Sequence, residues 1–569
     1  MFRSFLVLSL LIFVTAVPAL ISEELGESAQ LTKLTERYLY AMFEQDPVYA
    51  TQMGEYAPES LRYPDYSRKA QRALASEVKD LRRELRKIDQ SQLTANGKID
   101  AMLLDGELQT RLLLLEGTNL QQDNPKAYSS AALNGIYFLL ISPSFEDSAK
   151  ARMILERIFD LPRFLASSRE ELKAPPKVWI LLAEQEAETG LDFFAEVADF
   201  VAEQLPDRRN EIESAFTAAN TALEGFSDFL DALKLENEKS FAIGVADFNA
   251  LLKEQHFLDF DADSLLQLGE WLFEDALERR DSLAAIVETL TVESPTEYFV
   301  PQSFGPDDVL DYFQWEIDQT SDWLQRHGFV TVPQGIGACI PMETPRFLRN
   351  IIGGIAYQPP GPFERVQTGR FYVRPLPDTL DESSRAAWFR YCMQRGFKGS
   401  IVHEAYPGHH LQIELSNRNP SLIRRIVYNT VMMEGWALYC EEAMYEQGFY
   451  GDDPRRQLSI QDGVVFRAAR VIVDVRLQTG DWTYSEAVGW MIDNLGSSLE
   501  YVETEVGRYT LSPTQPMSYL IGKLQILEIR DLYRKQLGDA YSPAAFHDML
   551  LAEGSIPPAL ILKKLKKEL

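Results

Sequence analysis

The chain has 569 residues, with 85 Asp and Glu against 56 Lys and Arg, and a formal net charge of −29. Apolar residues make up 46% and charged residues 25%, a composition that excludes collagen, low-complexity fibres and extended disorder. Because this charge would repel phosphates over most of the surface, we expect no nucleic acid partner, and three cysteines are too few for a disulfide framework.

The N-terminus has the pattern of a secretory signal peptide over residues 1–19. Arg3 precedes the apolar run Phe5–Val14, and Val17-Pro18-Ala19 supplies the small residues that a signal peptidase requires. A membrane anchor is the alternative, but the run is short for a span of about 20 residues. No other apolar stretch is long enough to span. We therefore expect an exported protein, periplasmic or secreted, without stable membrane insertion.

Hydrophobic spacing predicts a mostly α-helical protein with two regions in one compact body. Residues 20–240 are predicted to be helical nearly throughout, and residues 68–90 place apolar side chains three and four apart among charges of both signs. Residues 241–569 are predicted to carry the chemistry. Between residues 335 and 377 Gly, Pro and aromatic residues become frequent, and Gly369–Val373 is rich in strand formers, which predicts a small β or extended segment.

Three of the six histidines fall within eight positions, in the segment HEAYPGHH from His403 to His410. Neutral imidazole is the commonest metal ligand in proteins, and an adjacent carboxylate is a common base. In the zinc-peptidase helix H-E-x-x-H the second histidine lies one turn after the first, but Pro407 occupies that position here. The strict motif is therefore absent.

A straight helix over residues 399–416 would not bring two of these histidines to one metal ion. His410 would share the face of His403 but lie about 10.5 Å further along the axis, and His409 would lie on another face. Pro407 removes a helix hydrogen bond, and the glycine that follows tolerates the resulting backbone. We therefore predict a bulge that returns His409 to a position above His403. His410 is the alternative ligand, and the histidine that does not bind metal would face substrate or support a ligand.

A third ligand is expected from Glu434, a lone carboxylate in the apolar segment MEGWALY. An acid in such a segment is costly unless it is paired or bound to metal, although a salt-bridged or surface acid is the alternative. Glu441 lies seven residues later on the same face of a helix predicted for residues 427–447. It could orient a metal ligand from behind, with a solvated charge as the alternative.

The segments HEAYPGHHLQ, from His403, and EGWALY, from Glu434, resemble the signature of the family called domain of unknown function 885. That family is grouped with gluzincin-type metallopeptidases, often exported. The resemblance covers most of the chain after the signal peptide and implies a large helical metallopeptidase-like body in which His403, His409 and Glu434 bind zinc. Weaker matches agree with it, at Asp46-Pro47, Ala174-Pro175-Pro176, Tyr357-Gln358-Pro359-Pro360, Gly369-Arg370-Phe371-Tyr372, Arg467…Arg470…Asp474, Arg508-Tyr509 and Tyr519…Gly522.

The chain departs from the family pattern after Asp474. That pattern continues with a glycine and then, two residues later, a histidine, whereas Val475-Arg476-Leu477-Gln478 follows here. Gln478 neither titrates near neutral pH nor donates as an imidazolium. If the histidine of the family contacts substrate, the specificity or rate of this protein differs, while the residues of the metal site are intact.

Other residues are candidates for contacts with the substrate or with the metal ligands. Tyr519 is predicted to donate to the oxyanion of a tetrahedral intermediate, with Lys523 on the same helix face. Arg508 and Arg470 could bind a substrate carboxylate bidentately, and Asp474 belongs to the same flanking motif. Helix packing for Tyr519 and ion pairs for the two arginines are the alternatives.

Together these residues predict an exported zinc metallopeptidase that hydrolyses short peptides. Glu404 is expected to take a proton from a water activated at the metal and to pass it to the leaving amine. Gly369–Val373 could offer an edge strand to the peptide backbone. The alternatives are a noncatalytic binding or scaffolding protein that retains the metal, and a metal hydrolase of other amides or esters. No serine elbow or nucleotide-binding glycine loop is present.

Overall fold

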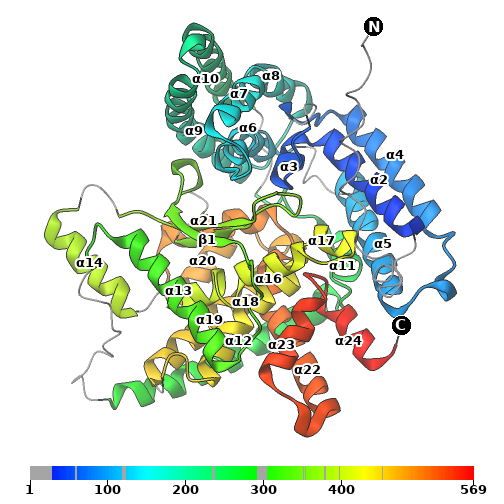
Figure 1. Ribbon diagram of the computed structural model, residues 1–569, viewed down its shortest axis with the longest axis vertical. Coiled ribbons are helices and arrows are strands. Elements are labelled where there is room, and N and C mark those ends of the chain that lie inside the picture. The colour runs from blue at the N-terminus through cyan, green and yellow to red at the C-terminus, as the bar shows by residue number, and fades with distance from the viewer. Residues whose placement is uncertain are drawn as a thin grey trace, which may run out of the picture.

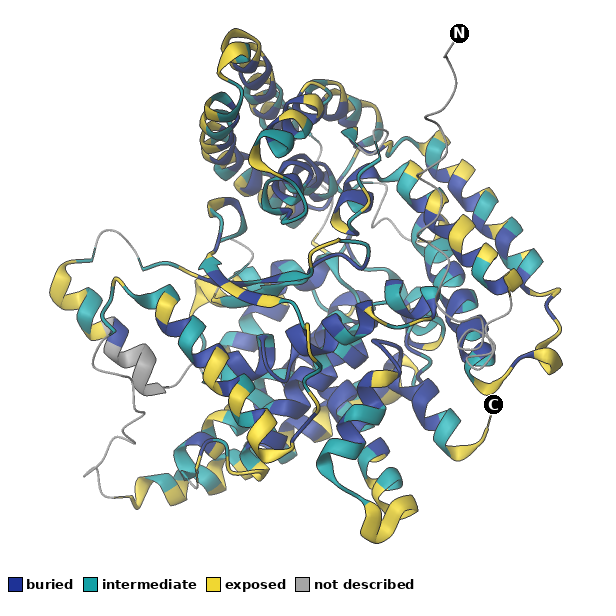
Figure 2. Cartoon of the chain, viewed as in Figure 1, coloured by how far each residue is buried: buried dark blue, intermediate teal, exposed yellow. Residues whose placement is uncertain are grey.

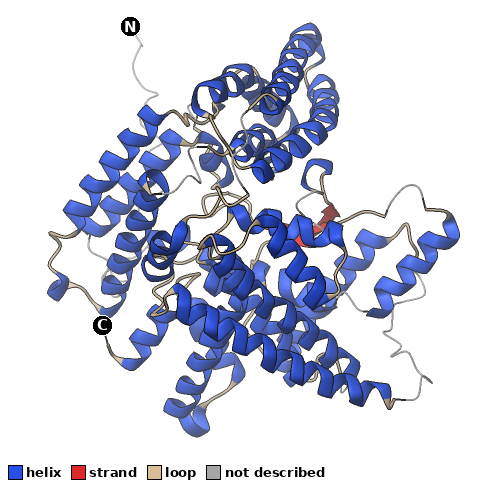
Figure 3. Ribbon diagram, turned by 180° about the vertical axis from the view of Figure 1, so that it is seen from behind, coloured by secondary structure: helices blue, strands red, loops and turns tan. Residues whose placement is uncertain are grey.

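The computed structural model describes residues 29–57, 61–117, 123–233, 238–290, 304–349, 352, 354–376, 380–395, 398–451 and 453–568. The predicted signal peptide, residues 1–19, lies outside these ranges. Within them the chain is mostly α-helical with one small sheet, so the predicted fold class is confirmed (Figures 1 and 3). Among the described helices, none is both long enough and apolar enough to cross a membrane.

The first helices form two groups (Figure 1). The group along one side of the molecule consists of α2 (Ala29–Gln45), α3 (Pro47–Gln52), α4 (Arg68–Leu85) and α5 (Ala95–Glu116). Side chains of Asp46, Ser67 and Thr94 accept backbone N–H groups of the first turns of α3, α4 and α5, which explains where these helices begin. The second group consists of α6 (Pro125–Ile141), α7 (Asp147–Ile158), α8 (Leu161–Glu171), α9 (Lys177–Gln204) and α10 (Arg209–Asp231).

The remaining helices surround the centre of the molecule. They are α11 (Gly244–Glu254), α12 (Ala262–Glu288), α13 (Val309–His327), α14 (Glu382–Arg395), α15 (Lys398–Glu404), α16 (His409–Asn417), α17 (Leu422–Ile426), α18 (Thr430–Glu446), α19 (Pro454–Gln478), α20 (Tyr484–Leu495), α21 (Leu499–Leu511), α22 (Gln515–Leu537), α23 (Pro543–Ala552) and α24 (Pro558–Lys566). α22 packs against both α18 and α19. The parts of these helices that face the centre of the molecule are buried (Figure 2).

The described part of residues 335–377 contains a sheet of three strands, as predicted. Its strands are β1 (Ala338–Glu343), β2 (Ile355–Gln358) and β3 (Thr368–Val373), in the order β1-β3-β2, with β1 parallel and β2 antiparallel to β3. Gly369–Val373 therefore lies in the central strand. The prediction that this segment is a free edge was wrong, because both sides of β3 already pair with neighbouring strands.

The sheet lies between two hydrophobic cores. Phe371 points into a core that joins the N-terminal helices to the central ones and that includes Leu104, Trp436 and Ile529. The next residue, Tyr372, points into the core of the α6–α10 group. This is the alternation expected of a strand buried on both faces. The sheet thereby fixes the α6–α10 group against the helices that carry the histidine segment.

Candidate metal centre

The helix predicted for residues 399–416 is interrupted rather than bulged. α15 ends at Glu404 and α16 begins at His409, with a turn between them. Pro407 cannot continue the helix, and a Cβ on Gly408 would lie 1.9 Å from the carbonyl oxygen of His403, so only glycine fits this approach. The Trp436 indole N–H donates to the Pro407 carbonyl at 2.9 Å and holds the turn against α18.

This turn brings His403 and His409 together at the junction of two short helices. Their ring centroids are 4.9 Å apart. Nε2 of His409 lies 3.3 Å and Nε2 of His403 lies 3.6 Å from Oε2 of Glu434, on α18. One possible ligand atom from each of the three side chains lies within 4.8 Å of the others. The three residues predicted to be ligands therefore converge.

His410 faces away from this cluster. The Tyr357 hydroxyl donates to its Nδ1 at 2.8 Å, and its Nε2–H donates to the carbonyl of Gly337 at 3.0 Å. Burial lowers the pKa of His410 to about 4, so the ring is neutral at physiological pH. Of the two alternatives left open by the sequence, the structure groups His409 with the other ligands, and His410 attaches α16 to the sheet.

The donor set suits a catalytic zinc ion. Two imidazole nitrogens and one carboxylate oxygen, with a position left for water, are the ligands of such sites. Within the described residues, Oε2 of Glu434 is buried and has no hydrogen-bond donor, although it faces the two histidines. Glu441 accepts the Nδ1–H of His403 at 2.8 Å, so the lone pair of a neutral His403 ring would lie on Nε2, which faces Glu434. The residues present therefore fit the metal.

The acidic groups around this cluster attract positive charge. Burial alone would lower the pKa of His403, but the nearby carboxylates of Glu434 and Glu441 raise it to about 10. The pKa of Glu434 lies well below its ordinary range, because the two imidazoles outweigh the effect of burial. A divalent cation would thus compete with protons for these side chains. Glu404 follows His403 at the end of α15, and burial raises the pKa of its carboxyl.

A close helix crossing brings Tyr519 to the cluster. A Cβ on Gly522 would lie 1.9 Å from the carbonyl oxygen of Val431, and one on Gly435 would lie 2.5 Å from the Cα of Gly522, so the backbones of α18 and α22 touch. Three residues before this contact, the ring of Tyr519 stacks beside His403, with centroids 6.2 Å apart. The predicted oxyanion donor therefore lies beside the metal ligands.

Lys523 lies on the same helix and is buried, but it does not contact the histidines. Its ammonium pairs with Glu442, a half-exposed residue of α18. The structure therefore places Lys523 in an ion pair between α18 and α22, and not with Tyr519 and the histidines.

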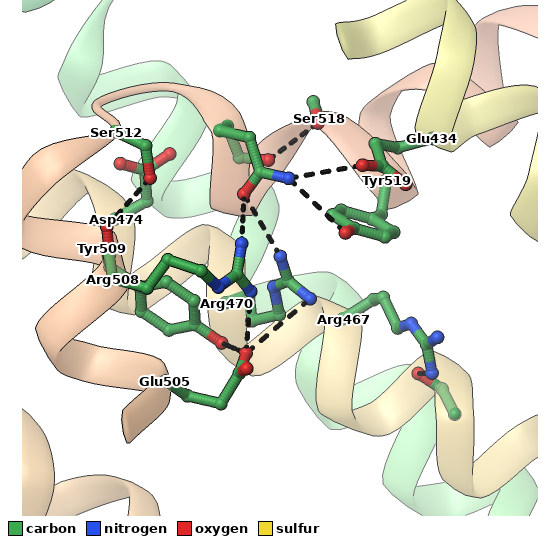
Figure 4. Close-up of polar contacts among 12 residues, drawn as sticks. Glu434, Arg467, Arg470, Asp474, Glu505, Arg508, Tyr509, Ser512, Ser518 and Tyr519 are labelled. Carbon is green, nitrogen blue, oxygen red and sulfur yellow. Dashed lines mark hydrogen bonds and ion pairs between the residues drawn. The ribbon is translucent and has the colours of Figure 1, made fainter. Parts of the chain in front are cut away.

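Arg470 and Arg508 lie on the far side of Tyr519 (Figure 4). Arg508 donates to Glu505 at 2.8 Å, and Arg470 lies 4.0 Å from the same carboxylate. The Arg470 guanidinium also covers the Tyr519 ring, 4.0 Å from its centroid. The Arg470 side chain is 4% exposed and that of Arg508 27% exposed. Both arginines therefore belong to an ion-pair network, and Arg508 is the more accessible.

Asp474 caps α22 and does not contact the candidate metal ligands His403, His409 and Glu434. Its carboxylate accepts the backbone N–H groups of Thr514 and Met517, each at 3.2 Å, at the start of α22. Burial raises the pKa of Asp474 to about 7 in spite of these two donors. One turn later, Gln478 is fully buried and donates to the carbonyl of Tyr509 at 2.8 Å. The departure from the family pattern at Gln478 thus falls on a buried side chain.

Sequence reasoning missed Gln515, which joins the arginines to the metal cluster. Its side chain contacts Arg470, Arg508, Glu434 and Tyr519. Its position four residues before Tyr519 would have been a signal only if the predicted helix had begun at Gln515, where α22 begins, and not two residues later.

Comparison with known proteins agrees with this fold. A family described as bacterial protein of unknown function (DUF885) matches residues 47–565, so the chain belongs to that family. A "putative lipoprotein of unknown function" from Shewanella oneidensis is 21% identical with a TM-score of 0.71, over 95% of this chain and 100% of that one. A "putative lipoprotein" from Colwellia psychrerythraea is 19% identical with a TM-score of 0.69, over 95% and 99%. These likenesses concern the fold, and no curated protein sequence matches the chain.

Proposed function

We propose that this protein is a zinc-dependent peptidase that hydrolyses short peptides. The observation that carries the proposal is the convergence of His403, His409 and Glu434 around a buried carboxylate oxygen that lacks a donor among the described residues. These side chains would hold the metal. Zinc bound there would act as a Lewis acid and would lower the pKa of a coordinated water toward neutrality.

The chain supplies the proton transfers and the stabilisation of charge. Glu404, next to His403, would take the proton of the attacking water and later pass it to the leaving amine. Burial raises the pKa of its carboxyl toward the range where such exchange is effective. The hydroxyl group of Tyr519 would donate a hydrogen bond to the carbonyl oxygen of the substrate as negative charge develops there. Burial also raises the pKa of Tyr519, which keeps its proton available.

We also propose that the protein is exported to the periplasm or secreted. The N-terminal residues carry the pattern of a signal peptide, and two solved structures of similar fold are each described as a "putative lipoprotein". Detection of the processed chain in a periplasmic or secreted fraction would support this proposal, and an unprocessed chain confined to the cytoplasm would contradict it.

Substitution of the base tests the proposed function. The purified protein is loaded with zinc, its metal content is measured, and a peptide library digest is analysed by mass spectrometry. We expect Glu404→Gln to keep its zinc and to lose roughly 10²–10⁴-fold in rate. Glu442→Gln, which removes a half-exposed partner of Lys523, is the control and should keep its rate. Unchanged turnover of Glu404→Gln would refute the role of Glu404, and full zinc loading without any cleavage would favour a noncatalytic metal-binding protein.

A further inference from the structure

Gln515 contacts four side chains of a polar network that ends at the candidate ligand Glu434. Figure 4 labels these four neighbours, Arg470, Arg508, Glu434 and Tyr519. Gln515 is the first residue of α22. Its Oε1 accepts from Arg508 at 3.1 Å and from Arg470 at 3.3 Å. Its Nε2 lies 3.3 Å from Oε1 of Glu434 and 3.3 Å from the hydroxyl oxygen of Tyr519. One amide group therefore contacts two cations, a carboxylate and a phenol.

The chemistry of these neighbours fixes the orientation of the amide. A guanidinium can only donate hydrogen bonds, so the oxygen of Gln515 must face Arg470 and Arg508. Both arginines are held from their other side by Glu505, which keeps them in place. The NH₂ group is consequently forced toward Glu434 and Tyr519, where it must act as a donor.

The first consequence is that the two oxygens of Glu434 become different. Oε1 is engaged by the NH₂ group of Gln515. Oε2 is left toward Nε2 of His403 and Nε2 of His409, without a donor from any residue in the described ranges. The amide thus presents one oxygen of the carboxylate to a cation and retains the other.

The second consequence concerns the proton of Tyr519. Because Gln515 can only donate at this point, the hydroxyl oxygen of Tyr519 acts as the acceptor. The hydroxyl hydrogen is then free to point away from Gln515. It is available to a substrate carbonyl, as the proposed function requires.

We propose that Gln515 is a positioning residue that presents Oε2 of Glu434 to the metal and the hydroxyl proton of Tyr519 to the substrate. This inference rests on the proposed function, because it explains how Glu434 and Tyr519 are oriented for the roles proposed for them there. Gln515 itself touches neither metal nor substrate in this account. Its effect passes through Glu434 and Tyr519.

Zinc affinity tests the first half of the proposal. Gln515→Leu removes the amide at similar size, and Gln536→Leu makes the same change at an exposed position of the same helix. Affinity for zinc alone is measured by competition with a chelator. Loss of a residue that orients a ligand typically costs roughly 10–100-fold, so we expect that loss for Gln515→Leu and none for Gln536→Leu. If the wild type binds zinc and Gln515→Leu binds it as tightly as Gln536→Leu does, the inference is overturned. If the wild type itself binds no zinc, the proposed function is refuted.

A double-mutant cycle tests the second half, with a variant that preserves the arginine contacts. Gln515→Glu keeps the size of the side chain and an acceptor for Arg470 and Arg508, but its carboxylate would accept a hydrogen bond from the hydroxyl of Tyr519 and so turn the hydroxyl hydrogen away from the substrate. We expect kcat to fall for Gln515→Glu and for Tyr519→Phe, and the double variant to fall little further than either. If, in the zinc-loaded enzyme, the fold-loss in kcat of the double variant equals the product of the two single losses, the coupling between Gln515 and Tyr519 is refuted. A lower melting temperature with unchanged kcat would show a merely structural role.

Discussion

Replacement of Glu441 by glutamine should weaken zinc binding without unfolding the protein. Glu441 accepts the Nδ1–H of His403 at 2.8 Å, and its side chain is 13% exposed. Although burial raises its pKa, the contacts with His403 and Arg467 lower it below the ordinary value, so the group is ionised. Glutamine preserves the shape and an acceptor oxygen but removes the negative charge that makes Nε2 of His403 a stronger ligand.

The expected magnitude follows from this geometry. A carboxylate behind a metal-bound histidine is worth roughly 10–100-fold in metal affinity, which corresponds to about 1.4–2.7 kcal/mol. Glu446→Gln is the matched control. Glu446 lies on the same helix, is 44% exposed and receives a hydrogen bond from Arg530 at 2.9 Å. A surface ion pair of this kind contributes about 0–1 kcal/mol to stability and has no path to the metal.

Two measurements on the two variants provide the assay. Chelator competition gives the zinc affinity, and thermal unfolding with and without zinc gives the stabilisation by the metal. We expect Glu441→Gln to lose affinity and part of that stabilisation, and Glu446→Gln to lose neither. Equal zinc affinity for both variants would refute the reasoning, because His403 would then need no carboxylate behind it.

Three further predictions concern the framework of the site. Gly522→Ala places a Cβ 1.9 Å from a backbone oxygen of α18, so we expect it to lower the free energy of unfolding in urea by about 1–3 kcal/mol. The control is Gly489→Ala, whose Cβ meets no described atom within 4 Å and which should be neutral or stabilising. Equal urea midpoints for the two variants would contradict this prediction. Arg424→Met leaves two buried carboxylates without their guanidinium and should cost about 3–5 kcal/mol, and an unchanged midpoint would exclude that role. Burial lowers the pKa of His547 to about 4 in the folded protein, against about 6.5 in the unfolded chain. Protonation therefore favours the unfolded chain, and about 3 kcal/mol of folding stability that is fully present above pH 6.5 is lost as the pH falls through 4. His547→Gln should therefore flatten the decline of the melting temperature over this range, and an identical decline would contradict the assignment.

The local sequence was enough to predict most helices, the small β segment and the side chains of the candidate metal site. The helix over residues 68–85 could be predicted because its apolar side chains recur three and four residues apart. The three converging side chains could be picked out because His403 and Glu434 place polar groups in apolar segments, where an unpaired group would be costly. Such signals need no knowledge of distant residues.

The details that failed depend on partners far away in the chain. Whether Gly369–Val373 is a central or an edge strand is decided by pairing with β2, which its own residues do not reveal. The sequence favoured His409 and kept His410 as the alternative, and it did not reveal that the hydroxyl of Tyr357 and the carbonyl of Gly337 contact both nitrogens of His410. The role of Gln515 likewise depends on contacts made by other helices.

The turn before α16 shows how a correct cause can give an incorrect geometry. Pro407 was expected to distort one helix, and a bulge was the smallest change that would place His409 above His403. The structure instead ends α15 and starts a new helix at His409, with Trp436 holding the turn from α18. The indole N–H of Trp436, 29 positions downstream, donates to the Pro407 carbonyl of this turn, and such a contact cannot be read from the local sequence.

Anomalous X-ray diffraction at the zinc absorption edge, from crystals of the zinc-loaded protein, tests the central claim most directly. The account predicts one strong peak about 2 Å from Nε2 of His403, Nε2 of His409 and Oε2 of Glu434. A map without a peak between these three atoms, or with the zinc bound elsewhere, would contradict it.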